Sequence, residues 1–142
     1  MLRNLISEDI EAISSRVNTV LKDFPQIAGA YLFGSTLGKC RPDSDIDLGL
    51  VLEDSNMSDK EQEQLETAIA YLLGTFNNKH YDITFVSPQS PIFSYRIIKD
   101  GCLIYVKNMD RITDIIEDVS RRYSEVYPRY RAALEDILSE VI

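Results

Sequence analysis

The sequence has no long apolar run and no sign of an export signal near its start. With tyrosine counted as polar, its longest apolar stretch is residues 48–52, five residues if glycine is counted, whereas a membrane span needs roughly 20. The acidic residues Glu8, Asp9 and Glu11 interrupt the region where the apolar part of a signal peptide would lie. We therefore expect a cytoplasmic protein that makes no contact with a membrane.

The sequence also has only two cysteines, Cys40 and Cys102, and few basic residues. Two thiols in such a chain favour the reduced state over a disulfide bridge. The 23 acidic residues outnumber the 15 basic ones and give a net charge of −8, of which −7 lies in residues 1–90. This balance argues against direct binding to nucleic acid, which requires clustered lysine and arginine, but it is compatible with a metal-bridged polyphosphate ligand.

What the sequence does contain is sufficient for one folded domain. Its 142 residues are 44% hydrophobic and 27% charged, and a domain of this size buries roughly two-thirds of its unfolded surface. Periodicity and turn residues predict helix 7–23, strand 27–33, strand 45–53, helix 58–74, strand 79–87, helix 93–99, strand 103–106 and helix 110–142. We therefore predict a compact α/β domain over residues 1–106, with a C-terminal helical extension, residues 107–142, packed on it.

Three details of these elements are specific enough to test. Ser7 is the predicted N-cap of the first helix, and the run from Ser58 to Glu61 matches a capping box at the start of the second. Pro128 should kink or split the last helix, because its ring blocks the hydrogen bond to the carbonyl of Ser124.

Asp45 and Asp47 stand in an alternating strand, which is an unusual place for aspartate. The alternation puts both on the face opposite the apolar residues, with their Cα atoms roughly 6.5–7 Å apart. Asp82 is likewise opposite the apolar residues of its own strand. If the two strands are neighbours, three carboxylates converge, and their mutual repulsion predicts bound divalent cations such as Mg²⁺. Two cations about 3.5–4 Å apart would clamp an in-line phosphoryl displacement.

Gly34 and Ser35 stand where the first predicted strand ends and a turn begins. Glycine lets the backbone approach a phosphate closely, and serine adds a hydroxyl donor. Lys39 and Arg41 follow in the same loop and could reach polyphosphate oxygens. Taken alone, an Asp-x-Asp pair is usually a solvated loop and a Gly-Ser pair is usually a turn. Their combination in this order favours a metal-assisted phosphate site.

These motifs resemble the signature of the nucleotidyltransferase superfamily that includes DNA polymerase beta. The resemblance is carried by Gly34-Ser35, by the loop 41–44, which reads Arg-Pro-Asp-Ser, and by the run 45–48, which reads Asp-Ile-Asp-Leu. The small size and the strand residues 79–82 are similar to the minimal nucleotidyltransferase (MNT) branch. Residues 97–105 resemble the helix, glycine and short strand that follow the third aspartate there. The resemblance covers about residues 25–106 and implies the nucleotidyltransferase fold, a small mixed sheet flanked by helices.

The resemblance implies transfer of a nucleotide from an NTP, usually ATP, to a hydroxyl group, with pyrophosphate as the leaving group. The residues that it assigns to the nucleotide are Gly34, Ser35, Lys39, Arg41 and Ser44. Asp45 and Asp47 would ligate two Mg²⁺ ions. Asp82 would help to bind the metal on the nucleophile side and would deprotonate the acceptor hydroxyl.

The same resemblance implies a protein acceptor. Many stand-alone MNT proteins are antitoxins paired with a HEPN-domain ribonuclease, and such an antitoxin adds AMP to a tyrosine hydroxyl of its toxin. The leading hypothesis is therefore an Mg²⁺-dependent adenylyltransferase with a HEPN toxin as partner. Two alternatives stay open: a small-molecule nucleotidyltransferase of the aminoglycoside-modifying kind, and a catalytically silent module that neutralises a toxin by contact alone.

The last predicted helix has two interpretations. Tyr123, Tyr127 and Tyr130 recur at helical spacing, which favours packing on the domain, with the neighbouring arginines solvated. Alternatively, the helix forms a homo-oligomer or docks the toxin, and the sequence does not rank these two.

Overall fold

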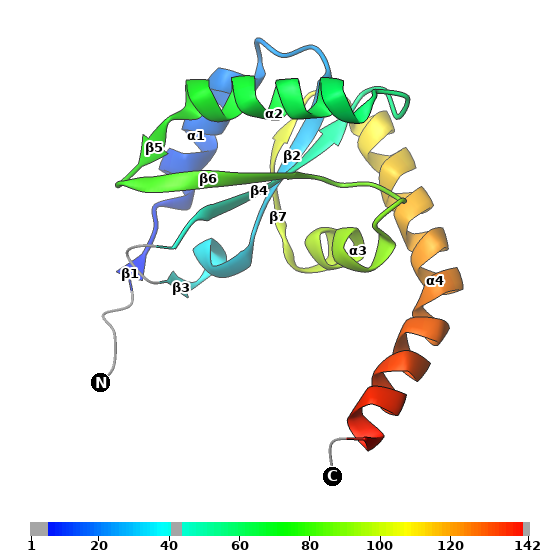
Figure 1. Cartoon of the computed structure of the whole chain (residues 1–142). Helices are drawn as coiled ribbons and strands as arrows, with labels where there is room; N and C mark the ends of the chain where they lie inside the picture. The colour runs from blue at the N-terminus through cyan, green and yellow to red at the C-terminus, as the bar shows by residue number, and fades with distance from the viewer. Residues whose placement is uncertain (1–5, 41–43, 141–142) are drawn as a thin grey trace.

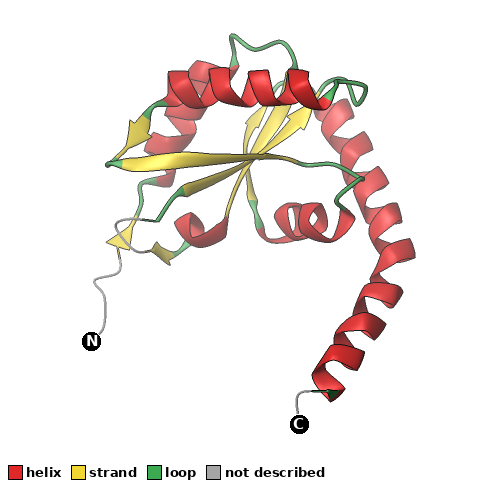
Figure 2. Cartoon of the chain, in the orientation of Figure 1, coloured by secondary structure: helices red, strands yellow, loops and turns green. Residues whose placement is uncertain are grey.

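The chain folds as a small mixed sheet with a pair of helices on each face (Figures 1 and 2). The structure, a computed structural model, describes residues 6–40 and 44–140. In chain order the elements are β1 (Ile6–Ser7), α1 (Ile10–Leu21), β2 (Ile27–Phe33), the 3-10 helix η1 (Gly34–Leu37), β3 (Lys39–Cys40), β4 (Ile46–Leu52), α2 (Asp59–Leu73), β5 (Thr75–Phe76), β6 (Lys79–Phe85), α3 (Pro91–Asp100), β7 (Cys102–Val106) and α4 (Met109–Ser139). The predicted α/β architecture is confirmed.

Within the described residues, the central sheet has five strands in the order β5-β6-β4-β2-β7. Strand β4 pairs in parallel with β6 and antiparallel with β2, so the sheet is mixed, as the resemblance implied. The short strands β1 and β3 pair with each other in a separate two-stranded sheet. The central position of β4 explains why its residues are buried on both faces for most of its length.

Each face of the sheet packs against its own helices. Helices α1 and α2 cover one face, which carries the alternate β4 residues from Ile46 to Leu52 and Tyr81 and Ile83 of β6. Helix α3 and the first turns of α4 cover the other face, where Val51 is fully buried. The predicted alternation along β4 is therefore confirmed, and the face that carries the aspartates is the one that α3 and α4 partly cover.

Two of the predicted helix starts can be compared with the structure. The capping box is confirmed, because the Ser58 hydroxyl accepts from the Glu61 amide at 3.2 Å and the Glu61 carboxylate accepts from the Ser58 amide. The prediction of Ser7 as the first N-cap is wrong. Ser7 pairs with Lys39 as part of β1, and Asp9 caps α1 by accepting from the Ala12 amide at 3.1 Å.

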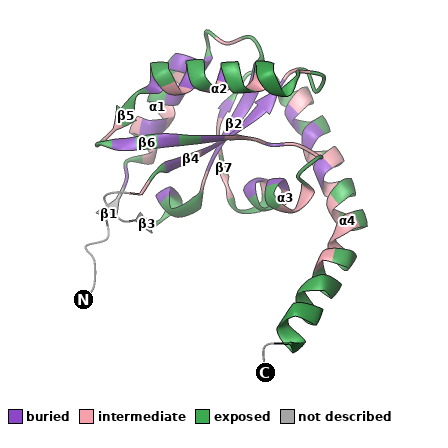
Figure 3. Ribbon diagram, viewed as in Figure 1, coloured by how far each residue is buried: buried purple, intermediate pink, exposed green. Residues whose placement is uncertain are grey.

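Helix α4 runs from the domain into open surroundings (Figures 1 and 3). Its buried residues, Ile112, Ile115 and Val119, all lie in its first half, whereas Ile137 and Leu138 are 59% and 67% exposed. Pro128 does not split the helix. The freed carbonyl of Ser124 is on an exposed part of the helix, where water can replace the lost hydrogen bond. No helix in the described part of the chain is long and apolar enough to span a membrane.

Candidate active site

The three predicted aspartates lie on one face of the β4–β6 pair. Asp47 is directly opposite Asp82 in the parallel register, and residues paired in this way have Cα atoms about 4.8 Å apart. Asp45 is exposed immediately before β4, two residues from Asp47 and therefore on the same face. The sequence argument required β4 and β6 to be neighbours, and the structure confirms this.

Helix α3 covers the same face only as far as Gly49. A Cβ atom at Gly49 would lie 3.1 Å from Ile97 Cγ2 and 3.2 Å from Val86 Cγ2, so the helix approaches the sheet closely there. Asp47 is two residues nearer the start of the strand and is only half-buried, and Asp82 is exposed. The aspartates thus stand where the helical layer ends and the sheet face opens to solvent.

Gly34 adjoins these carboxylates because β2 and β4 are antiparallel, with Phe33 opposite Asp47. Its φ of +77° lies in the left-handed region, and a Cβ atom there would collide with Asp47 Oδ2 and lie 3.2 Å from Asp47 Cγ. The positive φ favours glycine, and a larger residue here would require the Asp47 carboxylate to move. The Gly34-Ser35 turn, which begins η1, is therefore beside Asp47 and is exposed to solvent.

The crowding of carboxylates changes their titration. Burial, then the charges of Asp82 and Asp45, raise the pKa of Asp47 from 3.8 to about 6. On α2, burial followed by the charges of Asp82 and Glu63 also raises the pKa of Glu66. Negative potential thus extends from the aspartates to the neighbouring helix, which is the environment that a bound cation would relieve.

The donor set fits a hard divalent cation, since carboxylate oxygens are the ligands that Mg²⁺ prefers. Across residues 6–40 and 44–140, however, no three His, Cys, Asp or Glu side chains are gathered closely enough to hold a metal ion. The strand register nevertheless places the three aspartates on one face, with Asp47 opposite Asp82.

Of the other residues predicted to contact the nucleotide, Ser44, Lys39 and Arg41, the structure describes the side chain of Ser44 alone. The Ser44 hydroxyl accepts a hydrogen bond from Lys79 Nζ at 3.4 Å. Lys39 belongs to β3, but its side chain is outside the described part of the structure. Arg41 lies outside the described residues altogether.

Sequence reasoning missed two features near the site, the first on the sheet face opposite the aspartates and the second on their own face. The first is a buried ion pair between Lys79 and Glu8. The second is an aromatic pair: Phe33 and Phe93 are edge-to-face with ring centroids 5.8 Å apart, and Phe93 is 48% exposed. The position of Lys79, in step with the apolar Tyr81 and Ile83, was the available signal for the first. No local sequence signal indicated that α3 would bring Phe93 to Phe33.

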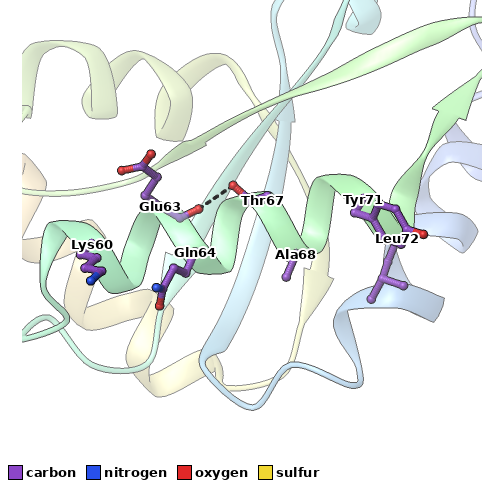
Figure 4. A pocket seen from close by; sticks show the side chains of 7 residues that line it. All are labelled: Lys60, Glu63, Gln64, Thr67, Ala68, Tyr71 and Leu72. Carbon is purple, nitrogen blue, oxygen red and sulfur yellow. Dashed lines mark hydrogen bonds between the residues drawn. The ribbon is translucent and has the colours of Figure 1, made fainter.

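Neither of two hollows on the surface contains a predicted site residue. One, of about 740 Å³, extends along α2 between Lys60 and Leu72, beside Tyr71, which is 83% exposed (Figure 4). The other, of about 830 Å³, is at the opposite ends of β4 and β6 from the aspartates and is bordered by Ser58 and Arg111. Of these two hollows, neither adjoins the three aspartates.

Comparison with known proteins agrees with this geometry. Residues 15–110 match the family model described as Polymerase beta, Nucleotidyltransferase, which covers more than half of the chain. The chain therefore belongs to this family of nucleotidyltransferases. No curated protein sequence matches it.

The solved structures that share the fold include toxin–antitoxin proteins. An MntA–HpeT toxin–antitoxin variant, with two aspartates spaced two apart replaced by glutamate, matches with a TM-score of 0.68 and 16% identity over 88% of this chain and 98% of that chain. A tri-AMPylated Shewanella oneidensis HEPN toxin in complex with MNT antitoxin matches with a TM-score of 0.64 and 18% identity, over 90% of this chain and 98% of that chain. A toxin–antitoxin structure with AMP-PNP matches with a TM-score of 0.64 and 17% identity, over 88% of this chain and 98% of that chain. At these identities the likeness shows the fold.

Proposed function

We propose that the protein transfers AMP from ATP to a tyrosine hydroxyl of a HEPN toxin, in an Mg²⁺-dependent reaction that makes it an antitoxin. The observation that carries this proposal is the arrangement of Asp47 opposite Asp82 and against Gly34. This arrangement combines ligands for a cation with a turn that a phosphate can approach. Residues 1–106 would form the transferase domain, and residues 107–142 a helical extension, of which the first half of α4 packs on that domain.

The proposed reaction is an in-line displacement at the α-phosphorus of ATP. The acceptor oxygen forms the new P–O bond as the bond to pyrophosphate breaks, and Asp82 takes the proton of the acceptor hydroxyl. The exposed Gly34-Ser35 turn would hold the triphosphate, with Lys39, Arg41 and Ser44 as further candidates for contact. Asp45 and Asp47, with Asp82, would hold Mg²⁺, which when bound would neutralise phosphate charge.

The partner assignment is supported by the structures that share the fold. One is described as a complex of an MNT antitoxin with a HEPN toxin that carries three AMP groups, and another contains AMP-PNP. Because the present chain aligns with 98% of each matched chain, no large additional domain in those proteins lacks a counterpart here. An ATP-using antitoxin of this kind would act in the cytoplasm.

The decisive experiment is transfer of label from α-labelled ATP. The protein is incubated with Mg²⁺ and the product of the adjacent gene, and Asp45→Asn/Asp47→Asn serves as the control. We expect label on a toxin tyrosine, identified by mass spectrometry, and no label with the double variant. Label on an aminoglycoside alone would favour the small-molecule enzyme. Toxicity that is suppressed equally by the double variant, without any label, would favour the silent binding module.

A further inference from the structure

A fully buried ion pair lies behind the candidate active site. Lys79 Nζ is 3.2 Å from Glu8 Oε1, and the two side chains are 0% and 1% exposed. Lysine and glutamate are almost never buried so completely unless they are paired, because removing either charge from water is costly. Glu8 is also bonded from a third segment, since Asn77 Nδ2 donates to its Oε2 at 3.1 Å.

The same lysine reaches the segment that carries Asp45. Lys79 Nζ donates to the Ser44 hydroxyl at 3.4 Å, and Ser44 directly precedes Asp45. The parallel register of β4 and β6 begins with Ile46 opposite Tyr81, and continuing it back by two residues places Ser44 opposite Lys79. The side-chain contact therefore extends the association of the two strands by two residues before their first backbone pair. Asp45 lies between Ser44, which Lys79 contacts, and Ile46, which pairs with Tyr81.

Because side chains alternate along a strand, the contact between Lys79 and Ser44 lies on the opposite face of the sheet from the three aspartates. Lys79 is in step with the buried Tyr81 and Ile83, whereas Asp82 points to the other face of the sheet. Ser44 is likewise in step with Ile46 and out of step with Asp45. Lys79, being buried on the far face, does not contact a substrate at the aspartates, so its role there is indirect.

The segment that carries Glu8 also pairs with β3. Glu8 follows β1, and β1 pairs with β3 through Ile6–Cys40 and Ser7–Lys39. Residues 6–8 are thus joined to Lys39 and Cys40 by backbone pairing and are linked to Ser44 through Lys79.

We propose that Glu8, Lys79 and Ser44 form a positioning network that sets the separation of Asp45 and Asp82 for metal binding. This inference rests on the proposed function, because it assigns the network to the metal site of that reaction. Glu8 and Lys79 act only through the aspartates and are positioning residues, whereas Ser44 is also a candidate for contact with the nucleotide. Partners behind the ligands of a metal commonly contribute a factor of 10–100 to metal affinity by fixing ligand geometry.

The test uses the full chain and three changes to the network. Glu8→Gln/Lys79→Met removes both charges together, so that neither is left buried and unpaired. Ser44→Ala removes the bond on the active-site side. Asn77→Gly removes only the amide bond to Glu8 and retains the positive φ of 51° at that position, so it perturbs the network from its far end without changing its charge.

The primary readout is Mn²⁺ affinity, measured without nucleotide from the loss of the free-ion EPR signal. We expect Glu8→Gln/Lys79→Met and Ser44→Ala each to weaken Mn²⁺ binding on the order of tenfold, and Asn77→Gly to weaken it less. Combining Ser44→Ala with the charge-removing pair should weaken binding no further, because both changes disrupt one network. In turnover assays, the Mg²⁺ concentration at half-maximal rate should rise by a similar factor, and high Mg²⁺ should restore the rate.

Ser94→Ala is the matched control. The buried Ser94 hydroxyl accepts from the Ser87 amide at 2.9 Å, at the far ends of these strands, so its loss should lower the melting temperature without changing Mn²⁺ affinity. Unchanged Mn²⁺ affinity in a folded charge-removing variant would overturn the proposal. So would an effect confined to Ser44→Ala, which would indicate direct ligand contact by Ser44. If the wild-type protein transfers no AMP, the proposed function fails, while the Mn²⁺ measurements still decide the positioning role.

Discussion

Replacing Asp47 with asparagine should make the metal-free protein more stable while abolishing its activity. Asp47 is half-buried, faces Asp82 across the parallel strands and lies against Gly34. These surroundings raise its pKa from 3.8 to about 6, which means that the folded state disfavours the ionised carboxylate. Asparagine has nearly the same shape and no charge, so it relieves the repulsion without creating a cavity.

The magnitude follows from the shift in pKa. A rise of about 2 units corresponds to roughly 3 kcal/mol if the carboxylate were fully shielded from water. Because Asp47 is partly exposed and solvent screens its neighbours, about 1 kcal/mol is the realistic gain. For a domain of 142 residues this corresponds to a melting temperature about 4 °C higher.

The gain must depend on pH in a defined direction. A carboxyl group with a raised folded-state pKa stabilises the fold fully below 3.8, and this contribution is lost as the pH rises through about 6. The difference between Asp47→Asn and wild type should therefore be absent near pH 3.5 and complete above pH 7, if the acidic form remains folded. Added Mg²⁺ should raise the melting temperature of the wild type and not that of the variant.

Thermal and urea unfolding in EDTA at several pH values would measure this difference. Asp114→Asn is the control, because Asp114 is an exposed carboxylate on α4, away from the three aspartates. A variant that is less stable than wild type at pH 7.5, or a difference that does not change with pH, would refute the electrostatic account of Asp47.

Three further changes test other parts of the structure. Gly34→Ala should destabilise the fold by about 1–2 kcal/mol and abolish AMP transfer, since φ is +77° and the new methyl group would meet the Asp47 carboxylate; urea unfolding and a pyrophosphate-release assay would check this. Ser58→Ala should remove the capping box and cost about 1 kcal/mol in urea unfolding, with AMP transfer retained. Leu138→Lys should change stability by less than about 0.5 kcal/mol, because Leu138 is 67% exposed; a larger loss in calorimetry would mean that the end of α4 is packed in solution.

The parts of the fold that sequence analysis predicted are those governed by local rules. The period-2 alternation of β4 put Asp45 and Asp47 on one face, and the hydroxyl and carboxylate of Ser58 and Glu61 marked the start of α2. The first N-cap was missed for a non-local reason. Ser7 and Asp9 are both good caps by residue type, and the choice between them is made by β1, which pairs with a strand more than 30 residues away.

Long-range contacts set the limits of the site prediction as well. Spacing alone could not place Asp82 opposite Asp47, because that register depends on β6 adding to β4 in parallel. Lys79 was overlooked because lysine is usually exposed, and its partner Glu8 belongs to a segment 71 residues earlier. In α4, the apolar periodicity continues past Val119, although no later residue of the helix is buried. Periodicity alone does not indicate where the helix extends beyond the sheet that it packs against.

The two faces of the β4–β6 pair explain how the crowded aspartates persist. On the α1/α2 side, the core residues from Ile46 to Leu52 and the Glu8–Lys79 ion pair hold the strands in one register. On the other side, that fixed register forces Asp47 against Asp82 and Gly34, an arrangement that is locally unfavourable. Such strain survives only where the surrounding structure over-determines the backbone, and it is typical of sites that bind a ligand. A cation bound by these carboxylates would replace the repulsion among them with attraction to the metal. The destabilisation that Asp47 causes without metal and the affinity of the site for metal should therefore both arise from the crowding of these carboxylates.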